Sequence, residues 1–379
     1  MTDGGAPLAG VRVVDLTTVV AGPWATHLLA GYGADVIKIE PPEGDIMRYA
    51  PPGRHPTMGP EFLHMNAGKR SVALDLKTGA GREEALALIA GADVFLTNVR
   101  PAAMERLGLA YADAKRANPE IVYVGIVGFD QRGPYAARPA YDDLIQGGCG
   151  LASLFAHTGG EPRYIPSLIA DRITGITAAN AVLAALFARE RGNGGASIEI
   201  PMFETMAELV LADHLGGHTY VPPAGDYGYQ RILTPHRRPY RTSDGYVCVL
   251  LYTPAQWQRF FTAAGRAEQY AAEPRLSDDA MRREHYDYAY AVVADIVAMR
   301  TSAEWLVLLE SIDVPFMPLH DVASLLDDPQ IAATGFVEER DHPTEGRIRT
   351  LRTPIRWDAL DDVDLRPAPN LGEHNRTQR

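Results

Sequence analysis

Asp171 is the carboxylate in this sequence whose surroundings best suit chemistry. It begins a predicted long helix over 171–190, follows a glycine-rich stretch at 146–153, and stands beside a helix face of small residues. The partial positive charge of a helix N-terminus favours an ionised carboxylate, which could act as a nucleophile or a base. Asp171 could instead be no more than the N-cap of that helix, and the spacing alone favours the cap.

A second group of candidates is cationic and lies at the edges of predicted strands. Lys77 and Arg100 come just after strands, and Arg106 lies on the helix that follows Arg100. Ligands of open α/β sheets bind at the carboxyl ends of the strands, so these cations could meet phosphate groups there. The alternative for each of them is an ordinary solvated surface charge.

The first strand-to-helix turn limits which nucleotide could bind. Ala21-Gly22-Pro23 supplies one glycine and a proline suited to a first helical turn, and it does not match the G-x-G-x-x-G fingerprint of dinucleotide-binding folds. Glu40 ends the second strand as a ribose-binding acid would, but without the fingerprint a solvated strand end is the better interpretation. The sequence also offers no Cys/His cluster with metal-ligand spacing, so we expect no metal.

The elements that must position these residues alternate regularly over the first 130 residues. Short β-branched runs followed by segments of helical period predict βαβ units and a mostly parallel sheet, which is an α/β architecture. A pattern change near 142 leads to the long helix, and the Pro-, Gly- and Tyr-rich stretch 221–240 predicts a crossing into a second domain. The predicted strands are 11–16, 35–39, 71–76, 93–97, 121–127, 197–201, 246–251 and 347–351; the predicted helices are 24–31, 80–90, 103–117, 171–190, 202–214, 254–265, 287–299 and 302–311.

Composition places the chain among ordinary globular proteins. Its 379 residues are 46% hydrophobic and 22% charged, with 36 Lys+Arg against 48 Asp+Glu, for a formal net charge of −12. An acidic chain without a basic run argues against nucleic acid and membrane as partners. Two cysteines, Cys149 and Cys248, and a start without signal-peptide features lead us to expect a cytoplasmic protein.

Seven blocks taken in order resemble one known family. They are LAGVRVVDLTTVVAGPWATHLLAGYGADVIKIEPPEGDIMR, NAGKRSVALDLKT, LTNVRPAAMERLGL, NPEIVYVGIVGFDQRGPYA, AYDDLIQGGCG, IADRITG and TSDGYVCV. The sequence resembles the class III CoA-transferases (CaiB/BaiF type), which include the carnitine and formyl-CoA transferases and the α-methylacyl-CoA racemases. The resemblance runs from about Leu8 to the LGEH at 371–374.

This resemblance implies an architecture as well as an activity. It implies a large Rossmann-like CoA-binding domain with a mostly parallel sheet, whose first part is 1–220, and a linker and smaller α+β domain over 221–330. The segment 331–379 would return to the large domain. Two chains would form a homodimer of interlocked rings.

The resemblance also assigns roles to residues. Asp171 in IADRITG matches the catalytic aspartate, which implies transfer of CoA from an acyl-CoA to a carboxylic acid through an aspartyl anhydride and an aspartyl-CoA thioester. CoA would be a substrate, and no metal or redox cofactor would be needed. The positions that match CoA contacts are Val20, Ala21, Leu74, Asp75, Lys77, Asn98, Val99, Arg100, Arg106, Arg138 and Tyr141.

Departures from the family pattern separate the alternatives. Val20 replaces the glutamine of formyl-CoA transferases, Val99 and Ala102 replace the usual Phe and Gly, and 215–245 lacks their glycine tetrad. Racemases carry a histidine base where this chain has Tyr141, and a phenol is a poor base near neutral pH. Transfer is therefore favoured over racemisation, with a non-catalytic CoA-binding protein as a third alternative.

Overall fold

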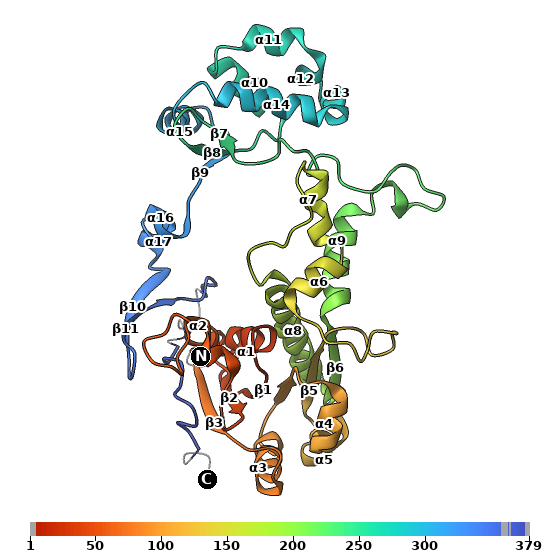
Figure 1. Cartoon of the computed structure of the whole chain (residues 1–379), viewed down its shortest axis with the longest axis vertical. Coiled ribbons are helices and arrows are strands. Elements are labelled where there is room, and N and C mark those ends of the chain that lie inside the picture. The colour runs from red at the N-terminus through yellow and green to blue at the C-terminus, as the bar shows by residue number, and fades with distance from the viewer. Residues whose placement is uncertain (1–4, 358–362, 364, 376–379) are drawn as a thin grey trace. The chain divides into compact units, whose positions relative to one another are not determined.

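The protein is described from a computed structural model, which covers residues 5–357, 363 and 365–375. The chain divides into two compact units (Figure 1). The large unit comprises Met1–Cys149, Tyr164–Leu209 and Gln330–Arg379, and the small unit comprises Gly150–Arg163 and Val210–Pro329.

A six-stranded parallel sheet forms the centre of the large unit. The strand order β3-β2-β1-β4-β5-β6 reverses direction between β1 and β4, so a topological switch point lies between these two strands. Val14 of β1 is in register with Ile37 of β2 and with Phe95 of β4. The strands are β1 (Arg12–Leu16), β2 (Asp35–Glu40), β3 (Lys69–Ala73), β4 (Val94–Thr97), β5 (Val122–Val127) and β6 (Ala196–Pro201).

Helices cover both faces of this sheet, which is why its inner strands are apolar on both sides. Val13 and Val14 are consecutive in β1, point to opposite faces, and are both fully buried. Helix α8 packs against α1, β5 and β6, whereas α3 packs against α5. The helices of this unit are α1 (Ala21–Gly31), η1 (Ile46–Tyr49), α2 (Pro60–Asn66), α3 (Gly79–Ala90), α4 (Pro101–Leu107), α5 (Tyr111–Ala117), α6 (Asp142–Gly148), α8 (Ile169–Ala188) and η3 (Arg189–Asn193).

The C-terminal segment of the large unit lies along the edge strand β3. The hydroxyl of Ser71 accepts from the backbone N–H of Gly372, and its carbonyl accepts from that of His374. Asn375 bonds the backbone of Ala73 through its side chain. Before this segment, β10 (Val337–His342) and β11 (Gly346–Leu351) form an antiparallel hairpin.

The small unit has an aromatic core beside a three-stranded antiparallel sheet of order β7-β8-β9. Trp257, Phe260 and Trp305 are almost fully buried in this core. Helix α9 (Met202–His214) begins in the large unit and ends in the small one, and α17 (Pro329–Thr334) marks the return. The remaining elements are η2 (Leu151–Ser153), α7 (Leu154–His157), η4 (Gly216–Thr219), β7 (Tyr240–Arg241), β8 (Tyr246–Val249), α10 (Pro254–Ala263), α11 (Ala267–Ala272), α12 (Pro274–Ser277), α13 (Asp279–Glu284), α14 (Tyr286–Val297), α15 (Ser302–Ser311), β9 (Phe316–Pro318) and α16 (Val322–Leu325).

The parallel α/β architecture predicted from the sequence is confirmed, and two local predictions are wrong. The strand predicted at 71–76 is β3, which begins at Lys69 and ends at Ala73. The single helix predicted over 103–117 is two helices, because Gly108 adopts the left-handed conformation (φ 67°) that ends α4. Helix α2 was not predicted.

Candidate functional site

The turn between β1 and α1 lies at the switch point of the sheet, and a side chain from the neighbouring strand end holds it. The Asn98 amide oxygen accepts from the N–H of Thr18 at 3.1 Å, and its amide nitrogen donates to the Thr18 carbonyl at 2.8 Å. The turn continues into Val20 and Ala21, which are both buried. Three of the residues matched to CoA contacts, Val20, Ala21 and Asn98, are therefore brought together here.

The close packing of this turn explains its glycine. A Cβ on Gly22 would lie 2.3 Å from the Cβ of Thr17, so no larger residue fits there. Val19 adopts a left-handed backbone (φ 70°), which is strained for a β-branched residue and must be held by its surroundings.

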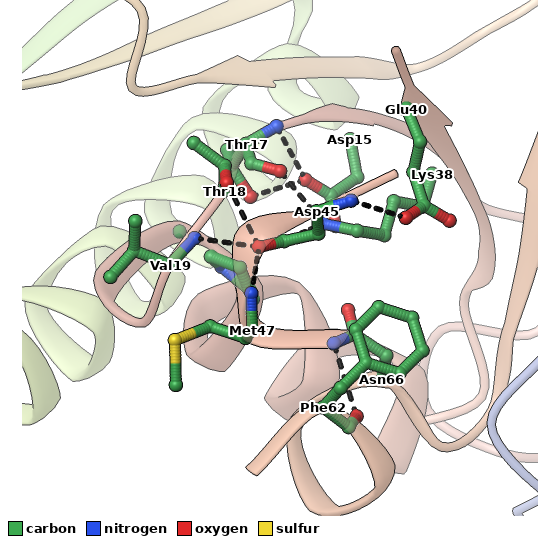
Figure 2. Close-up of polar contacts among 12 residues, drawn as sticks. Asp15, Thr17, Thr18, Val19, Lys38, Glu40, Asp45, Met47, Phe62 and Asn66 are labelled. Atoms are coloured by element: carbon green, nitrogen blue, oxygen red, sulfur yellow. Dashed lines mark hydrogen bonds and ion pairs between the residues drawn. The ribbon is translucent and has the colours of Figure 1, made fainter. Parts of the chain in front are cut away.

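A carboxylate beneath the turn supplies that hold, as Figure 2 shows. One Asp45 oxygen accepts from the Thr18 hydroxyl at 2.9 Å and from the Val19 N–H at 3.3 Å, and the other is 2.9 Å from the Lys38 ammonium. Lys38 also donates to the Thr17 carbonyl at 2.7 Å. Burial raises the pKa of Asp45, but the charge of Lys38 and the hydrogen bonds from Met47, Lys38 and Thr18 together outweigh burial and keep that pKa below its usual value.

Two further buried ion pairs involve residues of the strands β1, β2 and β3. Lys69 is 3.1 Å from Asp15, and Arg48 is 2.7 Å from Glu40. Glu40 is 1% exposed, so its interpretation as a solvated strand end is wrong. Its carboxylate is occupied by Arg48 and Ser71, which makes it a structural partner in this chain.

Asp171 lies in the first turn of α8 and is 9% exposed. The helix is capped by Leu168 without a side-chain hydrogen bond, so the interpretation of Asp171 as an N-cap is wrong. The pKa of Asp171 is raised from 3.8 to about 7, first by burial and then by the charge of Asp142, whereas Arg172 lowers it. Burial and Asp142 thus oppose the stabilisation of the ionised form expected from the helix N-terminus, and Asp171 is only partly ionised near neutral pH.

Asp142 and Gln146 of α6 hold the start of α8, and sequence reasoning missed both. One Asp142 oxygen accepts from the backbone N–H of Asp171 at 3.0 Å, and the other accepts from the Gln146 amide at 2.6 Å. Gln146 in turn accepts from the N–H of Ile165 at 2.9 Å. The spacing of four residues between Asp142 and Gln146 was the available signal, since it places both on one helix face.

The small-residue face of α8 allows α1 to approach closely. A Cβ on Gly175 would lie 2.6 Å from the Ala21 carbonyl oxygen and 3.1 Å from the Trp24 ring. The first turns of α1 make this close approach. It places the helix that carries Asp171 against the turn that carries Val20.

The other matched positions lie around the carboxyl ends of the strands or on nearby helices. Leu74 is buried just after β3, and Asp75 and Lys77 are exposed in the loop that follows. β3 and β4 are separated by β2 and β1, which is about 14 Å at the usual strand spacing. Around β4 and α6 the matched positions are Val99, which is half-buried, and Arg100, Arg106, Arg138 and Tyr141, which are exposed.

Three of these cations have no protein counter-charge in the described part of the chain. The side chains of Lys77, Arg100 and Arg106 make no hydrogen bond or ion pair with any residue in 5–357, 363 or 365–375. Arg138 stacks over the Tyr135 ring, with its guanidinium carbon 3.8 Å from the ring centroid. The same ranges contain no group of three or more His, Cys, Asp or Glu residues that could hold a metal ion.

One helical stretch, Ile169–Asn193, would be long and apolar enough to cross a membrane by length and composition, with a mean hydropathy of 1.3. Its main part, α8, packs against α1 and the sheet. That is the position of a core helix in an α/β layer structure.

A doubly covered parallel sheet, a tight turn at its switch point and a buried carboxylate of raised pKa define an α/β protein with an active-site-like centre. The sequence matches the family described as "CoA-transferase family III" over residues 8–375. The chain therefore belongs to CoA-transferase family III.

Relatives with described activities or structures match nearly the whole chain. A probable fatty acyl-CoA transferase of Mycobacterium tuberculosis is 31% identical, over 97% of this chain and 96% of its own. A succinate–glutarate CoA-transferase of Agrobacterium fabrum is 30% identical, over 97% and 94%. The crystal structure of a CaiB/BaiF family protein from Brucella suis superposes with a TM-score of 0.81 at 32% identity, covering 98% of both chains.

Proposed function

We propose that this protein transfers CoA from an acyl-CoA donor to a carboxylic acid acceptor, with Asp171 as the nucleophile. The observation that carries the proposal is the buried Asp171 carboxylate in the first turn of α8, on the helix that packs against the Val20–Ala21 turn. A carboxylate with a pKa of about 7 is substantially ionised at neutral pH, and its burial leaves it poorly solvated and reactive.

The proposed reaction runs through two anhydrides. The Asp171 carboxylate attacks the donor thioester, the C–S bond breaks, and a mixed anhydride and CoA thiolate result. The thiolate attacks the aspartyl carbonyl, which releases the donor acid and forms an aspartyl-CoA thioester. The acceptor carboxylate attacks that thioester, and the thiolate released then attacks the acceptor carbonyl of the new anhydride. This last step yields the new acyl-CoA and restores the Asp171 carboxylate.

The cations without protein partners support CoA as the substrate that carries the transferred group. Lys77 and Arg100 lie near the carboxyl ends of the parallel strands, where α/β sheets bind phosphorylated ligands, and Arg106 lies on the helix after Arg100. In this proposal they bind the phosphates of CoA, while Val20, Ala21 and Asn98 contact it at the switch-point turn. The carboxylate chemistry calls for no further cofactor.

The proposal includes the state in which the enzyme works. We infer a homodimer of interlocked rings, because the family resemblance implies it and because the chain leaves the large unit and later returns to it. We also infer a cytoplasmic location, since two cysteines without a CxxC pair suit a reducing compartment.

Trapping the acyl-enzyme tests the proposed function. Incubation with acyl-CoA followed by hydroxylamine should modify the peptide that contains Asp171, as seen by mass spectrometry. Asp171→Asn should abolish both the modification and transfer. Asp287→Asn is the matched control, because Asp287 is also an acid in the first turn of a helix but is exposed. An unmodified peptide together with an active Asp171→Asn enzyme would contradict the proposal.

The racemase alternative makes a separate prediction. If the protein were an α-methylacyl-CoA racemase, 2-methylacyl-CoA would exchange its α-proton for deuterium in D2O without any acceptor. We expect no such exchange, because exposed Tyr141 occupies the position of the racemase histidine. A non-catalytic CoA-binding protein would bind CoA equally well before and after Asp171→Asn, and would transfer nothing.

A further inference from the structure

Arg172, the residue after Asp171, has a guanidinium group without a hydrogen-bond or ion-pair partner in the described part of the chain. Its guanidinium carbon lies 4.1 Å from the centroid of the Trp24 ring, so the group stacks on the first turns of α1. Its five N–H donors make no hydrogen bond or ion pair with any residue that the structure describes. Arg48, by contrast, has its guanidinium bonded to Glu40 on two sides.

The indole of Trp24 adds a second donor that lacks an acceptor. Its Nε1 atom is buried and has no hydrogen-bond partner in the described structure. The adjacent Cδ1 atom of the same ring edge faces α8, 3.1 Å from the position of a Cβ on Gly175. Gly175 lies one helical turn beyond Asp171. A buried N–H without an acceptor costs free energy, and such groups in native proteins call for an explanation, of which a ligand is one.

The charges around the Arg172 guanidinium and the Trp24 N–H indicate that an anion is the ligand that would satisfy both donors. Burial lowers the pKa of Arg172, and Asp171 is the one charged group that opposes this effect. The neighbouring imidazoles are neutral near pH 7: burial lowers the pKa of His27 to about 4, and burial and then Arg172 lower that of His64, against the opposing charge of Glu61. A partly desolvated guanidinium beside an orphaned indole N–H is therefore suited to a carboxylate, which can accept from both.

The location of this pair restricts which carboxylate it can bind. The phosphates of CoA are separated from its sulfur by the pantetheine arm, so a group next to Asp171 faces the acyl part of the substrate. Consecutive helix residues point about 100° apart, and the Arg172 side chain lies over α1. A carboxylate bound there is displaced from the reacting carboxyl of Asp171. It is thus a second carboxylate of the substrate.

We propose that Arg172 and the Trp24 indole N–H form a subsite for the non-reacting carboxylate of a dicarboxylic acid whose other carboxylate reacts at Asp171. This inference rests on the proposed CoA transfer. It makes Arg172 and Trp24 the residues that select a dicarboxylic acid over a monocarboxylic acid of the same length.

The test compares acceptors that differ only in the second carboxylate. With propionyl-CoA as donor, kcat/KM is measured for succinate against butyrate and for glutarate against valerate. The ratio cancels any effect on Asp171 itself, because both acceptors react there. Arg172→Gln should lower the dicarboxylate preference about tenfold to a hundredfold, mainly through KM, as expected for a lost charge-assisted hydrogen bond.

Two further variants complete the comparison. Trp24→Phe keeps a ring under the guanidinium but removes the N–H, and should lower the preference about threefold to tenfold. Arg116→Gln is the matched control, because it removes one positive charge from an exposed helix of the same unit and should leave the preference unchanged.

The outcomes separate this inference from the proposed function. A wild-type enzyme that prefers the monocarboxylic acid at both lengths would overturn the subsite. An equal loss of kcat/KM for the dicarboxylic and the monocarboxylic acceptor in Arg172→Gln would also overturn it. So would a raised KM for propionyl-CoA alone, because that would indicate that Arg172 binds a phosphate of CoA. Hydroxylamine trapping with propionyl-CoA should still modify the Asp171 peptide in Arg172→Gln, which also shows that the variant is folded. Absence of that modification in the wild type would instead contradict the proposed function.

Discussion

Replacing Asp142 by asparagine should shift the pH dependence of the enzyme to lower pH. Asp142 accepts from the backbone N–H of Asp171 at 3.0 Å, and its negative charge is the second cause, after burial, of the raised pKa of Asp171. Asparagine keeps an oxygen for that hydrogen bond and removes the charge. Because the nucleophile must be ionised, the acid limb of kcat/KM reports the pKa of Asp171 in the free enzyme.

The size of the shift follows from Coulomb's law for a general pair of neighbouring charges. Two unit charges about 6 Å apart interact by about 1.4 to 2.8 kcal/mol at effective dielectric constants of about 40 to 20, which corresponds to one to two pH units. At a pKa of about 7 roughly a tenth of Asp171 is ionised at pH 6. A downward shift of about one unit would raise that fraction to roughly one half.

The assay is a set of kcat/KM profiles between pH 5 and 9 for the wild type and three variants. Asp142→Asn and Asp142→Ala should show the same shifted limb, since both remove the charge. Asp142→Ala should also lower the plateau, because it removes the acceptor that positions Asp171. Asp143→Asn, on the same helix but exposed, should leave the profile unchanged. An acid limb that stays in place or moves upward in Asp142→Asn would refute the electrostatic argument.

Three further predictions concern stability and packing. Because the folded pKa of Asp171 lies above its ordinary 3.8, ionisation destabilises the fold as pH rises between those values. Asp171→Asn should therefore raise the free energy of unfolding at pH 8 by up to about 4 kcal/mol, with no gain below pH 4. Urea titrations of the wild type and the variant at the two pH values measure this gain. A gain of the same size at both pH values would disprove the argument. Lys38→Met leaves Asp45 buried without its partner and should lower that free energy by about 3 to 5 kcal/mol in urea unfolding, whereas a loss below 1 kcal/mol would contradict a structural role. Gly175→Ala should force α1 and α8 apart and lower kcat/KM at least about tenfold. The control is Gly79→Ala, which should have wild-type kinetics because a Cβ on Gly79 would meet no atom within 4 Å. Equal kcat/KM values in the two variants would count against the close approach of α1 and α8.

The sheet was predictable from the sequence because its signal is local. A strand buried on both faces has a nearly continuous apolar run, and β1, β2, β4 and β5 fall within two residues of their predictions. The start of β3 was not predictable in this way, because Lys69 and Arg70 resemble a solvated edge. Lys69 is buried because Asp15, 54 positions earlier, pairs with it, and a single sequence does not display such a long-range pairing.

The features of the candidate site also divide into those with a local sequence signal and those that depend on residues distant in the sequence. The helix that carries Asp171 and its small-residue face follow from periodicity, so both were predicted. The raised pKa of Asp171 depends on burial and on Asp142 of another helix, and neither is visible locally. Asp142 and Gln146 were overlooked because a pair four residues apart occurs on many exposed helices.

Pairing, more than net charge, separates the cations of this acidic protein into two groups. Lys38 and Lys69 are fully buried and each has a carboxylate within about 3 Å, so their charges are compensated within the fold. Lys77, Arg100 and Arg172 have no such partner among the described residues, and each lies near the strand ends or Asp171. An uncompensated cation attracts an anion locally even when the whole chain carries a charge of −12, because screening in salt limits the reach of distant charges to about 10 Å. An acidic protein can therefore bind an anionic substrate, provided that the cations at its site are those that the fold leaves without partners.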